Sequence, residues 1–177
     1  QTVLRIPLEG KQLPILETET PEKTAYFVYA DKPASFKLEG AQVYFPAGSF
    51  YKDVFLNLEA DSAVVRIHEP SLPMHRNFTL TFDVSHLPRE ERGQYFIARL
   101  DESDRPQHQK TYRREDQFTA RSRNLGRYTL ARDTVPPVIR PKNFKKNQWL
   151  TNYRYLSLRI SDDLSGISSY SATLNGQ

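Results

Sequence analysis

The segment Asn77-Phe78-Thr79-Leu80-Thr81-Phe82-Asp83-Val84 decides the fold class of this chain. Its even-numbered residues are apolar, whereas Thr79, Thr81 and Asp83 between them are polar. Successive side chains of a strand point to opposite faces, so this period of two predicts a β-strand with one face on a core and the other in water.

The same alternation recurs outward from this segment in both directions. Turn residues such as Glu39-Gly40, Arg92-Gly93 and Leu125-Gly126 separate the apolar stretches. The best helical candidate, residues 88–92, is a single polar turn. The sequence therefore predicts an all-β fold, an antiparallel β-sandwich with further strands at residues 25–29, 41–45, 54–58, 63–68, 95–100, 117–120, 127–131 and 156–160.

A strand over residues 127–131 runs into the double proline Pro136-Pro137, which indicates a domain boundary. We expect residues 1–20 to be the last strand of a preceding β domain plus a linker, and residues 21–133 to be the β-sandwich domain. Residues 134–177 are expected to form the N-terminal half of an immunoglobulin-like domain, a partial, truncated sandwich. Its uncovered inner face predicts self-association or completion by a missing segment.

Composition narrows the class of protein. The chain of 177 residues is 38% hydrophobic and has no apolar run long enough to span a membrane, and its first residues lack the features of a signal peptide. It contains no cysteine, which excludes disulfides, thiolate zinc sites and cysteine nucleophiles.

Positive charge is concentrated in residues 105–159, which hold 14 Lys/Arg against three Asp/Glu. Such a segment predicts either a solvated face or a module that binds an acidic or glycan polymer. We favour the solvated face because the basic residues are scattered and no nucleic-acid recognition motif accompanies them.

Four histidines, His68, His75, His86 and His108, are the candidate metal ligands. None stands at a spacing typical of zinc sites, although a loop could bring His68 and His75 together. Paired carboxylates suited to acid–base chemistry are available among Asp101, Glu102, Asp104, Glu115 and Asp116. No Gly-x-Ser-x-Gly elbow or phosphate-binding glycine loop is present. We therefore assign no catalytic, cofactor-binding or metal-binding residue.

The turn Ser161-Asp162-Asp163-Leu164-Ser165-Gly166 offers oxygen ligands and is a candidate calcium site. Asp, Ser and Gly also build β-turns without any ion, and we favour that interpretation. The strand pattern does not explain the position of Trp149.

Two blocks of sequence carry a family resemblance: residues 40–56, which begin Gly40-Ala41-Gln42-Val43-Tyr44-Phe45-Pro46-Ala47-Gly48, and the stretch from Leu125 through Pro136-Pro137 to Ile167. Together they resemble the non-catalytic C-terminal region of exported lysostaphin-type (LytM-like) zinc metallopeptidases of Gram-negative bacteria. The first block is also similar to the opening of sandwich domains in zonula-occludens and netrin-receptor proteins.

The resemblance implies a function for the chain. It implies an exported, periplasmic or secreted protein whose catalytic domain lies upstream and cuts peptide cross-links of peptidoglycan. The zinc ligands of such peptidases match no position here, so we expect a non-enzymatic accessory region without a cofactor that positions or docks that domain. The alternatives are a binding module for acidic or glycan polymer through residues 105–159 and a hydrolase using His68, His75 or the nearby carboxylates.

Overall fold

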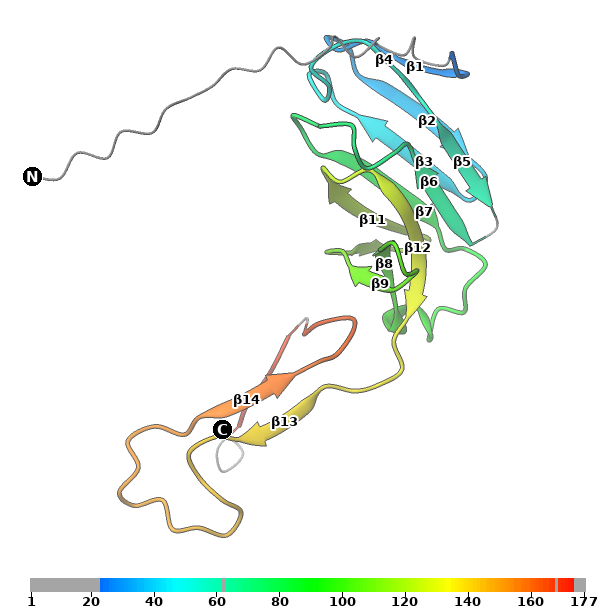
Figure 1. Cartoon of the computed structure of the whole chain (residues 1–177). Helices are drawn as coiled ribbons and strands as arrows, with labels where there is room; N and C mark the ends of the chain where they lie inside the picture. The colour runs from blue at the N-terminus through cyan, green and yellow to red at the C-terminus, as the bar shows by residue number, and fades with distance from the viewer. Residues whose placement is uncertain (1–22, 62, 168, 174–177) are drawn as a thin grey trace, which may run out of the picture.

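Two five-stranded antiparallel sheets form a β-sandwich around one core in the computed structural model, which describes residues 23–61, 63–167 and 169–173 (Figure 1). The strand orders are β10-β11-β7-β3-β2 and β5-β6-β12-β8-β9, and the pairs β1-β4 and β13-β14 form separate ribbons. The strands are β1 (Tyr26–Val28), β2 (Ala34–Leu38), β3 (Ala41–Phe45), β4 (Val54–Leu56), β5 (Leu58–Asp61), β6 (Val64–Ile67), β7 (Phe78–Asp83), β8 (Tyr95–Leu100), β9 (Pro106–His108), β10 (Tyr112–Arg114), β11 (Gln117–Ser122), β12 (Gly126–Arg132), β13 (Val138–Pro141) and β14 (Leu158–Ser161). The all-β prediction is confirmed.

Strand β7 lies at the centre of the first sheet and alternates as its sequence predicts. Phe78, Leu80 and Phe82 are buried, whereas Thr79 and Thr81 on the other face are half-buried. Its neighbours are β3 on one side and β11 on the other. Residues of β3 and β11 are register partners of β7 one by one, so the buried residues of these three strands share one face of the sheet.

Aromatic rings connect the two sheets through the core. The Phe78 ring centroid lies 5.7 Å from that of Phe45 and 5.8 Å from that of Tyr128, which belongs to β12 of the second sheet. The buried Tyr128 hydroxyl donates to the Asn124 carbonyl and lies 2.9 Å from Ser122 Oγ. This contact resembles the tyrosine corner of Greek-key sandwiches, and burial raises the pKa of the phenol.

The structure differs from the sequence-based strands in several places. The single strand expected at residues 54–58 is broken at Asn57: β4 pairs with β1, whereas β5 pairs with β6. Strands β2, β9 and β10 were not expected from the sequence. All three are edge strands with one hydrogen-bonded neighbour, and β9 and β10 have no buried residue, so neither shows an alternating apolar pattern.

The short helical turn expected at residues 88–92 is displaced: a 3₁₀-helix, η1, forms at Arg92–Gln94. Within the described ranges, no helix is both long and apolar enough to cross a bilayer.

Beyond the sandwich, β13 and β14 pair antiparallel from Val138↔Ser161 to Pro141↔Leu158. The second of these strands begins two residues later than the expected start at Leu156. Trp149, between them, is 91% exposed. The strand and linker expected in residues 1–20 lie outside the described residues, as do residues 174–177, and the domain boundaries remain predictions.

Candidate functional site

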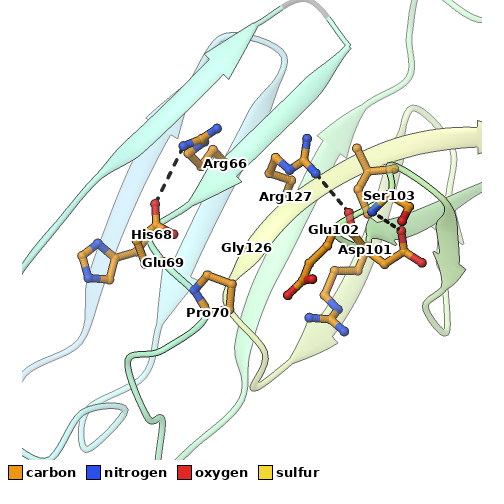
Figure 2. A pocket seen from close by; sticks show the side chains of 11 residues that line it. Arg66, His68, Glu69, Pro70, Asp101, Glu102, Ser103, Gly126 and Arg127 are labelled. Carbon is orange, nitrogen blue, oxygen red and sulfur yellow. Dashed lines mark hydrogen bonds and ion pairs between the residues drawn. The ribbon is translucent and has the colours of Figure 1, made fainter.

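A surface hollow of about 510 Å³ lies where the ends of β6 and β8 meet the start of β12 (Figure 2). We call it the Arg127 hollow. Its lining combines cations, carboxylates and one imidazole: Arg66, His68, Glu69, Pro70, Arg99, Leu100, Asp101, Glu102, Ser103, Gly126 and Arg127. The structure thus brings together His68, Asp101 and Glu102, three of the residues considered as candidates from the sequence.

Strand register positions two of the three arginines that line this hollow, Arg66 and Arg127. Arg66 of β6 and Arg127 of β12 are register partners on adjacent strands, next to the partners Val65 and Tyr128. Val65 and Tyr128 are buried in the core, so the pleat directs Arg66 and Arg127 to the outer face of the sheet.

Two of the three arginines that line the hollow, Arg66 and Arg127, are paired with neighbouring oxygen atoms. Arg127 Nη1 lies 2.5 Å from Asp104 Oδ1, and its Nη2 donates to the Asp101 carbonyl at 3.0 Å. Arg66 approaches Glu59 and Glu69 at 3.8 Å each. These groups are largely exposed, so the pairs add little stability, but they leave the hollow close to charge balance.

Asp101 organises the loop after β8. Its Oδ1 accepts hydrogen bonds from the amides of Ser103 and Arg105, both at 2.9 Å. These bonds, chiefly the one from Arg105, hold the pKa of the carboxyl below its usual value. The Asp101 carboxylate therefore acts as a turn-forming acceptor and is a poor base.

Both the ring and the backbone of His68 form hydrogen bonds with the backbone of Asn57. Its Nδ1 accepts a hydrogen bond from the Asn57 amide at 3.1 Å, and its own amide donates to the Asn57 carbonyl at 2.7 Å. A neutral imidazole that accepts at Nδ1 carries its proton on Nε2. With Nδ1 occupied by the Asn57 amide, the neutral His68 ring is a hydrogen-bond donor at Nε2 and a poor base.

Substitution of His68 by asparagine should remove part of the pH dependence of folding stability. Burial lowers the pKa of His68 from 6.5, with Glu69 opposing, so the unfolded chain binds protons more readily than the folded one. Stability is therefore full above pH 6.5 and falls as the pH drops through the folded-state pKa. Asn tolerates the backbone φ of 50° found here.

The measurement is the unfolding midpoint in urea between pH 7.5 and 5.5. We expect a smaller decline in His68→Asn than in the wild type, and a residual decline from His108, whose pKa burial also lowers. His86→Asn, at an exposed site, serves as the control. An unchanged pH profile in His68→Asn would contradict the assignment.

The other candidates lie apart from this hollow. The His75 ring packs on Tyr51 with centroids 5.5 Å apart, and His108 packs on Phe96 at 5.4 Å. His86 lines a separate hollow of about 220 Å³ between the sheets. Within the part of the chain that the structure describes, no three His, Asp or Glu side chains are grouped as metal ligands would be.

The remaining carboxylates have structural partners. Asp116 forms an ion pair with Arg92 at 2.8 Å, and Glu115 lies in the β10–β11 turn. Asp162 Oδ1 accepts from the amides of Leu164 and Gly166, at 3.0 and 2.8 Å. These bonds favour the β-turn interpretation of residues 161–166 over the calcium site.

The basic segment does not form one surface. Arg105 approaches Asp101, Arg132 pairs with Glu91 at 3.3 Å, and Arg113 donates to the Tyr95 carbonyl. Other basic residues, such as Arg140 and Arg159, lie on the β13-β14 ribbon.

A third hollow, of about 400 Å³, was not anticipated from the sequence. We call it the Tyr112 hollow; it lies on the outer face of the first sheet and is lined by Tyr112, Arg114, Gln117, Thr119 and Arg121. The alternation of residues in β11 predicts which side chains of this strand face outward. No pattern in the sequence predicts that β10 forms and pairs with β11.

The fold and these surfaces define a class: an antiparallel β-sandwich module with polar outer sheet faces. The chain belongs to the Zu5-like domain family, whose model matches residues 25–133. Comparisons with curated proteins and with solved structures gave no significant match.

Proposed function

We propose that the chain is a non-catalytic accessory region that acts as a rigid spacer. The observation that carries this is the bridge made by Asp133 at the end of the sandwich. Its amide donates to the Gln94 carbonyl at 2.8 Å, and its Oδ2 accepts from the Ser165 amide at 3.0 Å. One residue thus connects η1 of the sandwich with the turn that follows β14.

The remaining oxygen of the same carboxylate orders the boundary itself. Asp133 Oδ1 accepts from the Val135 amide at 3.0 Å, immediately before Pro136 and Pro137. Proline restricts the backbone on both sides of this contact. A boundary that is hydrogen-bonded at one end and stiffened by two prolines keeps two β units at a defined separation, as a spacer requires.

The biological setting belongs to the same proposal. The order of the Gly40–Gly48 block, the Pro-Pro boundary and the Asp162–Gly166 turn supports an exported peptidoglycan endopeptidase of the lysostaphin type, with the catalytic domain upstream. The test is the reading frame before Gln1. Zinc-ligand motifs of the forms His-x-x-x-Asp and His-x-His there would support the proposal, and an unrelated upstream domain would remove the peptidase setting.

Substitution of Asp133 by alanine should loosen the boundary without unfolding the sandwich. The change removes the carboxylate that accepts from Val135 and Ser165, whereas the sandwich core is untouched. We expect lower backbone order parameters and faster amide exchange at residues 135 and 165 in NMR measurements, with the amides of β7 unchanged.

Asp163→Ala is the matched control, because Asp163 lies in the same turn but makes no hydrogen bond or ion pair with any residue the structure describes. Equal order parameters in Asp133→Ala and the wild type would show that the boundary is rigid for another reason, and the spacer proposal would lose its main support.

A further inference from the structure

The outer face of the first sheet is organised in cross-strand rows. Tyr112, Thr119, Thr81, Gln42 and Lys37 are successive register partners across all five strands. A second row runs Arg121, Thr79, Tyr44, Ser35, and a third begins Arg114, Gln117, Asp83. Residues in register on one face are near neighbours, so these side chains form a continuous surface.

The shape of the Tyr112 hollow follows from side-chain length. Thr119 is the shortest side chain that lines it, and the longer Tyr112, Arg114, Gln117 and Arg121 surround Thr119. The Thr119 hydroxyl lies 3.4 Å from Thr81 Oγ1 of the neighbouring strand β7. The hollow thus presents a hydroxyl group and the Gln117 amide, which are donors and acceptors suited to sugar hydroxyls.

The cations of this hollow are not neutralised. Arg114 and Arg121 are exposed, and neither has a hydrogen bond or an ion pair with any described residue. Lys110 adds a third charge, with its Nζ 5.4 Å from the centroid of the Tyr112 ring. The Arg127 hollow differs, because two of its three arginines, Arg66 and Arg127, are paired with carboxylates of the chain itself.

Spacing distinguishes the possible ligands. Arg114 pairs with Gln117, and Arg121 lies four residues further along β11, so the two guanidinium groups are anchored roughly 13 Å apart along the strand. Tyr112 lies between them, half-exposed, opposite Thr119. An aromatic ring flanked by two separated arginines matches a chain of sugar rings with carboxylates at intervals, because Arg binds carboxylate in a bidentate manner. A nucleic-acid groove usually neutralises about 6–10 phosphates. The cations of this hollow are too few for that.

We propose that the Tyr112 hollow binds an acidic polysaccharide, with one sugar ring stacked on Tyr112 and carboxylates of the chain paired with Arg114 and Arg121. This proposal is independent of the spacer function. It confines polymer binding to one sheet face and leaves the rest of residues 105–159 without a role in it.

The test uses the full 177-residue chain and polygalacturonate as the probe, with fully methyl-esterified polygalacturonate as the uncharged counterpart. Isothermal titration calorimetry should detect binding to the acid form that weakens as salt increases, and at least a roughly tenfold weaker affinity for the ester. In the wild type, amide chemical-shift changes in NMR spectra should be concentrated in β10 and β11.

Matched variants locate the site. Arg114→Gln/Arg121→Gln should weaken binding of polygalacturonate by roughly tenfold or more. Arg140→Gln/Arg159→Gln removes the same charge from paired positions on β13 and β14 and should leave the affinity within about twofold of the wild type. Tyr112→Ala should weaken the binding of both polymers, because stacking of a sugar on the ring does not depend on the charge of the polymer.

The proposal is overturned by any of four results. These are absence of binding to polygalacturonate, equal losses in the two double variants, shift changes confined to other strands, and equal or tighter binding of a single-stranded oligonucleotide or of anionic lipid vesicles. The substituted side chains are all exposed, and unfolding midpoints equal to that of the wild type verify that the variants are folded.

Discussion

Replacement of Phe78 by alanine is expected to lower the free energy of unfolding by about 3–5 kcal/mol. Phe78 is fully buried in β7, the central strand of the first sheet, and its ring lies against Phe45 and against Tyr128 of the second sheet. Truncation removes buried apolar surface and leaves a cavity between the sheets, which rigid strands on both sides cannot close.

The measurement is unfolding in urea, followed by far-UV circular dichroism. Tryptophan fluorescence would not report on the core, because Trp149 is 91% exposed and lies outside it. Tyr51→Ala is the control: Tyr51 is 71% exposed, and its loss should change stability by less than about 0.5 kcal/mol. A loss in Phe78→Ala no larger than that of the control would contradict the packing described for the core.

Replacement of Arg92 by methionine is expected to cost about 1.5–3 kcal/mol. The Arg92 side chain is only 11% exposed, and it donates to the Leu87 carbonyl at 3.0 Å, to the Glu115 carbonyl at 2.6 Å and to Asp116 Oδ1 at 2.8 Å. Methionine retains much of the apolar contact but leaves these acceptors without a donor. We expect a smaller loss of stability than for a fully buried ion pair, because the Asp116 side chain is 49% exposed.

Arg89→Met is the matched control, since Arg89 is exposed and makes no hydrogen bond or ion pair among the described residues. Hydrogen exchange provides a second measurement: loss of Arg92 should speed exchange at the β10–β11 turn, which its guanidinium ties to the segment before η1. Similar stability of the two variants, with unchanged exchange at that turn, would contradict this role.

Strand prediction succeeded where one face of a strand is buried. The segments 41–45, 95–100 and 127–131 were predicted to within one residue at each end. It failed at the edges of the sheets, where β9 and β10 have no buried residue and therefore no alternating apolar pattern. The break at Asn57 was also missed, because it depends on the contact with His68, eleven residues away.

The candidate sites were less predictable. His68, Asp101 and Glu102 were named among the candidates, and the structure places all three in one hollow. Their chemistry depends on partners that the sequence does not identify, such as the Asn57 amide that occupies Nδ1 of His68. The Tyr112 hollow was missed because it arises from the pairing of β10 with β11.

The residues by themselves determined that this chain is an all-β protein, because alternation of apolar and polar side chains is a local property that a strand converts directly into two faces. Tertiary structure decided which arginines are neutralised and which remain unpaired on a sheet face. Arg127 forms an ion pair with Asp104, whereas Arg114 and Arg121 form none with any carboxylate that the structure describes. The physical reason is that charge pairing depends on strand register and turn geometry, which bring together residues that are distant in sequence.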